Sequence, residues 1–163
     1  MSRIYYTTME SPVGALRLVA EELGLRMVWF VRGRKEEKPD AEWKEDAAFF
    51  ADVKRQLSAY FAGELQEFEI PLLMLGTEFQ KRVWKALLAI PYGETMSYGQ
   101  LAKKIGEPKA VRAVGAANGQ NPIPIIVPCH RVIGSDGSLT GFGGGLENKK
   151  KLLELESRQR RLL

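Results

Sequence analysis

The only cysteine and the only histidine of this chain are neighbours, Cys129 and His130, in a stretch rich in proline and glycine. A lone cysteine is usually an inert buried residue, but a nearby imidazole or helix N-terminus can raise its small thiolate fraction at neutral pH. We expect His130 and Arg131 to favour the anion in this way. Adjacent side chains seldom face each other, so a proton-transfer pair also needs a carboxylate that orients the ring. The candidates on the following helix are Glu147, Glu154 and Glu156.

The composition excludes several other kinds of chemistry. One cysteine cannot form an internal disulfide, and together with one histidine it cannot supply the four ligands of a structural zinc site, so we expect neither a metal nor a cofactor. The longest apolar run, 123–127, is far shorter than the roughly 20 residues of a membrane-spanning helix. Residues 1–8 lack the apolar core of a signal peptide. We therefore expect a cytoplasmic protein that has no contact with a membrane.

The charge gives a mild indication of a nucleic-acid partner. With 24 basic and 20 acidic residues the net charge is +4, and basic charge attracts phosphate backbones. The basic residues gather in three places, within 103–112, at 149–151 and within 158–161. Since many lysines only solvate a surface, the composition supports DNA or RNA binding without establishing it.

The first part of the chain has the pattern of a small antiparallel sheet with a helix. Apolar and polar residues alternate around turn signals, which predicts strands over 4–8, 15–20 and 26–31. A charged segment, 32–45, is expected to form a surface loop. Helical spacing then predicts a helix over 46–61, and a short strand is expected over 68–72.

The second part is expected to be helical, with a domain boundary that separates 1–75 from 76–163. Apolar spacing, capping residues and prolines predict helices over 77–90, 97–105 and 109–118. The last two are joined by a turn that contains Gly106, which is the helix-turn-helix pattern, although an ordinary helical hairpin has the same spacing. An irregular loop over 119–145 and a final helix over 146–156 complete an α+β fold of two lobes.

Residues 76–156 resemble the O6-alkylguanine-DNA alkyltransferases, also called methylated-DNA–protein-cysteine methyltransferases. The most specific segments are Pro128-Cys129-His130-Arg131-Val132, the upstream Asn121-Pro122 and the downstream Gly144-Gly145-Leu146. The resemblance implies a ribonuclease H-like scaffold over 1–75 and a DNA-binding, alkyl-accepting domain over 76–163. It implies DNA repair by direct reversal, in which one alkyl group passes stoichiometrically and irreversibly from O6-alkylguanine to Cys129. A wider specificity would include O4-alkylthymine as a second substrate. The chain would then be a single-turnover transferase.

The resemblance also implies a role for each catalytic residue. Cys129 accepts the alkyl group, His130 takes the thiol proton through a water, and Glu156 holds the imidazole ring. Asn121 braces the cysteine loop, and Tyr98 helps to turn the nucleotide out and hydrogen bonds to the flipped base. The alternatives are a plain turn residue for Asn121, as is common before proline, and a structural start of a helix for Tyr98.

Two further groups of residues follow from the same resemblance. Arg112 is expected to fill the gap that the flipped base leaves in the stack, or else to contact a phosphate. The implied DNA-binding residues are Tyr98, Lys109, Arg112, Ala113, Asn118 and Arg131. The implied pocket residues are Pro124, Val132, Leu139, Phe142 and Gly143. Relatives carry Tyr and Ser where this chain has Phe142 and Gly143, so neither side chain offers a hydroxyl and donation to O6 is left to the Gly143 backbone N–H.

The expected partner is double-stranded DNA that carries O6-alkylguanine, bound by a monomer; the sequence leaves open whether several copies bind cooperatively. Two other function classes are compatible with parts of the pattern. A cysteine hydrolase would use Cys129, His130 and an acid to form an acyl enzyme, but it has no need of a helix-turn-helix. The other class is a non-enzymatic DNA binder, either a regulator or a lesion sensor of related fold. The retained Cys129 argues against the sensor, because such relatives lack the acceptor cysteine.

Overall fold

The computed structural model describes residues 3–31 and 39–161, so 32–38 of the expected surface loop lie outside the described residues. The chain forms two compact units, Met1–Met74 and Leu75–Leu163, and each is described by itself.

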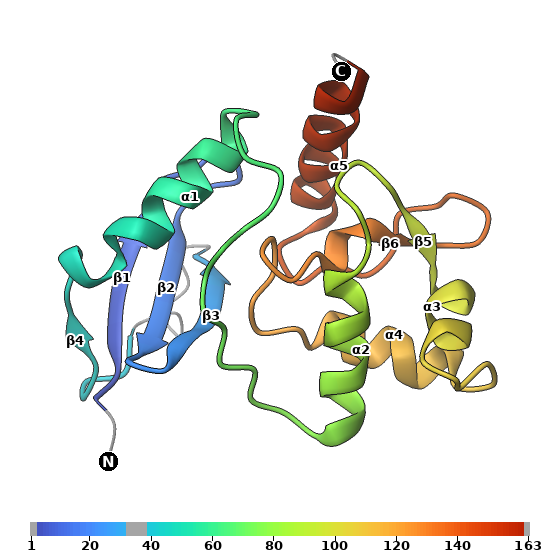
Figure 1. Ribbon diagram of the computed structural model, residues 1–163, viewed down its shortest axis with the longest axis horizontal. Coiled ribbons are helices and arrows are strands. Elements are labelled where there is room, and N and C mark those ends of the chain that lie inside the picture. The colour runs from blue at the N-terminus through green and yellow to red at the C-terminus, as the bar shows by residue number, and fades with distance from the viewer. Residues whose placement is uncertain (1–2, 32–38, 162–163) are drawn as a thin grey trace. The chain divides into compact units, whose positions relative to one another are not determined.

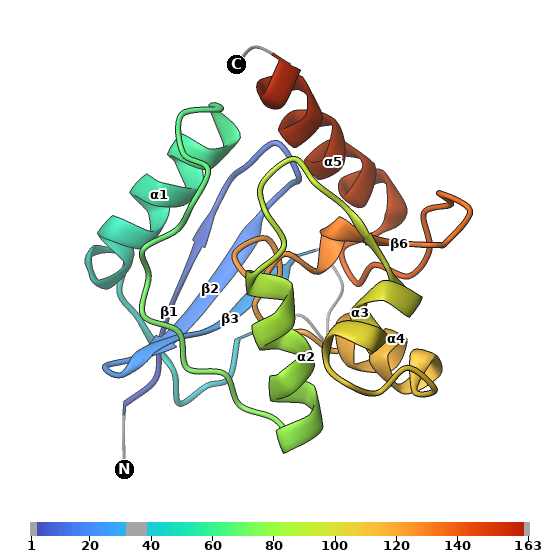
Figure 2. The same cartoon turned by 45° about the vertical axis from the view of Figure 1, so that its right-hand side comes forward.

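The N-terminal unit is a sheet with a helix. Strands β1 (Tyr5–Met9), β2 (Leu16–Glu21) and β3 (Gly24–Phe30) pair antiparallel in a meander, and the short β4 (Lys44–Glu45) joins β1 in parallel, which gives the order β3-β2-β1-β4. Helix α1 (Ala51–Phe61) lies along this sheet (Figures 1 and 2). The unit thus has the α+β character that the alternation and the helical spacing predict.

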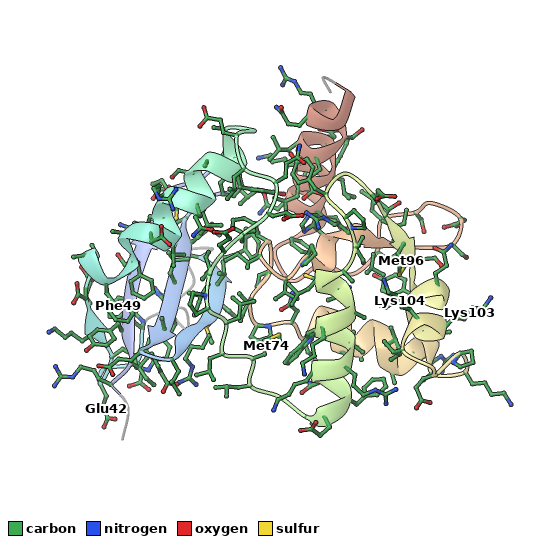
Figure 3. All side chains as sticks on the ribbon, viewed as in Figure 1. Glu42, Phe49, Met74, Met96, Lys103 and Lys104 are labelled. Carbon is green, nitrogen blue, oxygen red and sulfur yellow. The ribbon has the colours of Figure 1, made fainter. Side chains whose placement is uncertain are left out.

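Two elements of this unit differ from the expectation. The expected helix over 46–61 is regular only from Ala51, after a 3-10 turn over Ala48–Phe50, because the Asp46 carboxylate accepts a hydrogen bond from the Phe49 N–H at 3.1 Å and holds the chain in a turn. The Phe49 ring, labelled in Figure 3, stacks on Tyr5 of β1 with ring centroids 4.3 Å apart. The expected strand over 68–72 is only an isolated bridge between Leu25 and Leu72.

The C-terminal unit is built from α2 (Glu78–Leu88), α3 (Tyr98–Lys104), α4 (Val111–Gly119) and α5 (Leu146–Arg161), as Figure 1 shows. Thr77 and Ser97 begin α2 and α3 with complete capping boxes, in which the cap hydroxyl and a glutamine three residues later exchange hydrogen bonds with the backbone. Helices α3 and α4 pack against each other across the turn at Gly106, whose φ of +79° suits a residue without a Cβ. This is the expected pair of short helices.

A two-residue ladder joins the start of α3 to the cysteine segment. Strand β5 (Met96–Ser97) pairs in parallel with β6 (Val132–Ile133), which directly follows a 3-10 turn over Cys129–Arg131. Helix α5 runs five residues beyond the expected end and packs against that turn. Among the described residues, no helix is both long and apolar enough to cross a membrane.

Candidate active site

Cys129 lies at the start of the 3-10 turn and is 5% exposed. Its N–H donates to the Val127 carbonyl at 2.8 Å, and its own carbonyl accepts a hydrogen bond from the Asn118 side chain of α4 at 3.3 Å. The backbone on both sides of the sulfur is therefore held in place. The thiol is set in the interior rather than on a mobile surface loop.

Asn121 braces the loop that leads to the cysteine. Its amide donates to the Val127 carbonyl at 2.8 Å, and its carbonyl oxygen accepts from the Ile123 N–H at 2.9 Å. Between these anchors lies the buried Ile125, whose φ of +75° is a strained conformation for a β-branched residue. The side chain of Asn121 thus does more than start a turn before Pro122, since it spans the strained residue and fixes the approach to Cys129.

His130 and Glu156 form a buried pair. The Nε2 atom of His130 lies 2.7 Å from Oε2 of Glu156, and both side chains are almost fully buried. Of the three candidate acids, Glu156 meets the ring, whereas Glu147 and Glu154 are exposed. An ionised carboxylate can only accept a hydrogen bond, so the proton of the neutral ring belongs on Nε2. That leaves a lone pair on Nδ1, which is buried and makes no hydrogen bond to the described residues.

Arg131 does not lie where a DNA contact requires it. Its side chain is only 7% exposed, and its Nε and Nη2 atoms donate to the two oxygens of Glu156 at 2.8 and 3.1 Å. Its Nη1 atom donates to the Ile90 carbonyl at 2.7 Å, and its guanidinium lies over the Tyr92 ring at 5.7 Å. The expectation that Arg131 binds DNA is corrected here, because its donors are directed into the protein interior.

The environment of the thiol also differs from the expectation. Burial raises the pKa of the Cys129 thiol to about 11, although hydrogen bonding by Asn121 and the charge of Lys149 act to lower it. His130 and Arg131, the residues expected to favour the anion, are not the groups that do so. In the resting protein the sulfur is therefore a thiol rather than a thiolate.

The charges of the His130 and Glu156 pair are set by their surroundings. Burial acts to raise the pKa of Glu156, but hydrogen bonds and charge from His130 and Arg131 outweigh it and hold the pKa at about 2. Burial lowers the pKa of His130, the Glu156 carboxylate opposes this, and the charges of Arg131 and Lys149 lower it further. A neutral imidazole next to an ionised carboxylate can accept a proton.

Tyr98 and Lys149 meet at one backbone carbonyl of the 134–145 loop. The Tyr98 hydroxyl donates to the Thr140 carbonyl at 3.1 Å, and the Nζ atom of Lys149 donates to the same oxygen at 2.8 Å. Lys149 also donates to the Val132 carbonyl at 2.7 Å. One buried ammonium thus ties the expected pocket loop to the strand that follows the cysteine.

The expected pocket residues differ in exposure. Pro124 and Val132 are buried, Leu139 and Phe142 are half-buried, and Gly143 is exposed. They come from the cysteine loop, from β6 and from the 134–145 loop. Tyr98 is half-buried, and its ring lies against Gly115 of α4, where an added Cβ would come within 3.7 Å of it.

The exposed residues among the expected DNA contacts gather around the start of α4. Lys109 precedes the helix, and Arg112 and Ala113 lie in its first turn, all of them exposed. The exposed Lys103 and Lys104 of α3 are labelled in Figure 3. Asn118 is instead buried and holds the Cys129 carbonyl, so its expected DNA contact is corrected as well.

The interpretation of the sequence missed Lys149. Its place in a lysine run suggested a solvated surface, yet it is fully buried. The signal was helical periodicity, because Lys149 shares a spacing of three, four and seven residues with Leu152, Leu153 and Glu156. That spacing puts all four on the face of α5 that turns inward.

Comparison with known proteins agrees with this geometry. Residues 4–74 match the family model described as "6-O-methylguanine DNA methyltransferase, ribonuclease-like domain", and residues 78–158 match the one described as "6-O-methylguanine DNA methyltransferase, DNA binding domain". A methylated-DNA–protein-cysteine methyltransferase of Methanosarcina acetivorans is 57% identical over 94% of this chain and 98% of its own length. A methylated-DNA–protein-cysteine methyltransferase of Mycobacterium tuberculosis is 54% identical over 94% of this chain and 92% of its own length.

The solved structures lead to the same family. The crystal structure of Mycobacterium tuberculosis OGT in complex with DNA is 53% identical, covers 95% of this chain and 94% of its own, and has a TM-score of 0.86. The crystal structure of the Mycobacterium tuberculosis O6-methylguanine methyltransferase has a TM-score of 0.85 at 52% identity. The match covers 96% of this chain and 94% of that structure's chain. The chain belongs to the 6-O-methylguanine DNA methyltransferase family.

Proposed function

We propose that this protein repairs DNA by moving the alkyl group of O6-alkylguanine onto Sγ of Cys129, once per molecule. The observation that carries the proposal is a buried thiol next to a histidine that a carboxylate orients, in a chain whose relatives are methylated-DNA–protein-cysteine methyltransferases. A structure of a relative in complex with DNA supports DNA as the partner. We place this activity in the cytoplasm, on chromosomal DNA.

The first step is removal of the thiol proton. Because burial keeps the pKa of Cys129 high, the thiol needs a base at the moment of reaction. The free lone pair on Nδ1 of His130 takes the proton, through a bridging water as the resemblance implies, while Nε2 stays on Glu156. The thiolate that results is flanked by the Asn121 amide and the charge of Lys149, both of which favour the anion.

The second step is a displacement at the alkyl carbon. A bond forms between Sγ and that carbon, the bond from the carbon to O6 breaks, and its electron pair stays on guanine. Hydrogen bonds to guanine make it a better leaving group, and the Tyr98 hydroxyl and the Gly143 backbone N–H are the donors that we assign to it. In the absence of DNA the Tyr98 hydroxyl is held by the Thr140 carbonyl. The resulting thioether is a stable bond that no residue here reverses.

Access to the buried thiol requires that the nucleotide leave the helix, which costs a few kcal/mol. We assign Arg112 to the gap left in the base stack, with α4 in the minor groove, where readout depends little on sequence. Its exposure in the first turn of α4 supports this role, as does the exposure of Lys109 and Ala113 beside it. A monomer is sufficient for this chemistry.

The test is intact-mass measurement after mixing the protein with an equimolar duplex that carries one O6-methylguanine. We expect a gain of one methyl group per protein, none with the undamaged duplex and none for Cys129→Ala. Turnover of an activated ester with no gain in mass would instead identify a cysteine hydrolase. Replacing the lesion with O4-methylthymine tests the wider specificity in the same assay.

A further inference from the structure

Arg131 is a buried cation that the steps above do not use. Its guanidinium donates to both oxygens of Glu156, at 2.8 and 3.1 Å, while Oε2 of the same carboxylate also meets His130 at 2.7 Å. One negative charge is therefore placed between two groups that can each be positive. We propose that Arg131 is a positioning residue that keeps His130 neutral in the resting protein, an inference that rests on the proposed function.

The argument is one of charge balance in a buried site. The guanidinium is always charged, so Arg131 already compensates the negative charge of Glu156. A proton taken from solvent by His130 would add a buried cation with no anion to match it. Among the described residues, Lys149 of α5 is a further cation that acts on the ring, and the adjacent Cys129 is a neutral thiol. Beyond the guanidinium lies Tyr92, a phenol that is neutral at physiological pH and whose pKa burial raises further above its ordinary value of 10.

The proton of the thiol is different from a proton of solvent. When the S–H bond of Cys129 breaks and an N–H bond forms on Nδ1 of His130, a thiolate appears together with the imidazolium, and the total charge of the site does not change. Arg131 opposes the imidazolium in both cases, but in the internal transfer the new thiolate offsets that charge, whereas a proton from solvent has nothing to offset it. The ring remains available as a base until a substrate is in place.

Removal of the guanidinium should reverse this selectivity. Glu156 would then share its charge with His130 alone, and the pair would bind one proton from solvent at a higher pH. The consequence is the same for either site of this proton: an imidazolium has no lone pair to offer, and a carboxylic acid no longer accepts a hydrogen bond from Nε2. Both arrangements take the ring out of use as an oriented base.

The experiment uses the single histidine of the chain, because one imidazole gives one set of ring resonances in an NMR titration. The probe is the proton alone, with no DNA present, so the result does not depend on whether alkyl transfer occurs. We compare wild type with Arg131→Met, which removes the charge, and Arg131→Lys, which keeps it. Leu152→Ala is the control, since it opens the buried face of α5 without a change of charge.

We expect wild-type His130 to titrate below its ordinary pKa of 6.5, because burial lowers this pKa first and the charge of Arg131 lowers it further. The midpoint should rise by about one pH unit in Arg131→Met and stay near wild type in Arg131→Lys and Leu152→Ala. The acidic limb of the rate of reaction with free O6-benzylguanine should move to higher pH by the same amount. An unshifted midpoint in Arg131→Met, or an equal rise in Leu152→Ala, would overturn the proposal. If Arg131→Met does not fold, a wild-type midpoint at or above 6.5 overturns it by itself.

Discussion

Replacement of Glu156 by glutamine should destabilise the C-terminal unit in a way that depends on pH. The carboxylate accepts hydrogen bonds from His130, from Arg131 and from the Gly93 N–H at 3.2 Å. A glutamine offers one acceptor oxygen in place of two, and its amide would point donors at groups that are themselves donors. The substitution therefore leaves the guanidinium of Arg131 buried without a counter-charge.

Two independent routes give the magnitude. Lowering the pKa of Glu156 from 4.5 to about 2 corresponds to about 3 kcal/mol of folding stability at neutral pH, and the side chain is 1% exposed, so solvent screens little of it. Breaking a buried ion pair by removal of one partner costs about 3–5 kcal/mol. A loss of this size lowers the melting temperature of a chain of this length by about 10 °C.

The pH dependence has a definite sign. Because folding lowers the pKa of Glu156, its contribution is complete above pH 4.5 and is lost as the pH falls towards 2. The stabilities of wild type and Glu156→Gln should therefore differ most at neutral pH and converge near pH 2. No such convergence is expected if the two chains differ only in packing.

The assay is urea unfolding at several pH values between 2 and 7. Substituting Trp29 and Trp43 by phenylalanine leaves the buried Trp84, in the same unit as Glu156, as the only tryptophan. Glu154→Gln is the matched control, two residues away on the exposed side of the same helix, and should leave the curve unchanged. A difference below about 1 kcal/mol at pH 7, or one that persists at pH 2, would refute the reasoning.

Two further predictions concern reactivity. Arg112→Ala should lower the rate of repair in duplex DNA by at least an order of magnitude but leave the rate of reaction with free O6-benzylguanine near wild type. The reason is that only the duplex has a base stack with a gap to fill. Equal losses of rate in both assays would remove the base-flipping role. Lys149→Met should raise the pKa of Cys129 further and slow the reaction of the thiol with iodoacetamide at pH 8, on the order of tenfold for each unit of pKa. The control is Lys150→Met, an exposed neighbour, and a rate in Lys149→Met equal to that of this control would show that the ammonium does not act on the sulfur.

Much of the architecture could be predicted because it is encoded locally. Thr77 and Ser97 are each followed three residues later by a glutamine, and both begin helices with complete capping boxes. Alternation in the first 31 residues predicted β1 to β3, since period two is a property of the strand itself. Strands of two residues, such as β5 and β6, are too short to show a period in the sequence. Their pairing is not visible in the sequence either, because the two strands lie more than thirty residues apart.

The positions that were misjudged are those whose burial depends on packing. Arg131 and Asn118 have side chains typical of a surface, yet partners from distant elements draw both inside. Lys149 lies in a run of lysines, yet it falls on the buried face of its helix. Polar residues at buried positions are identified by the groups that satisfy them, and such groups come from elsewhere in the chain.

By itself the sequence determined which atoms could react, since it holds one thiol and one imidazole side by side, and it determined the helices and strands whose capping and periodicity are local. The family resemblance already implied Glu156 as the acid that meets the ring, but only the tertiary structure decided that Arg131 shares that carboxylate and that Lys149 is the cation near the sulfur. The physical reason is that chemical type belongs to a residue, whereas desolvation and charge pairing depend on what the folded chain brings around it.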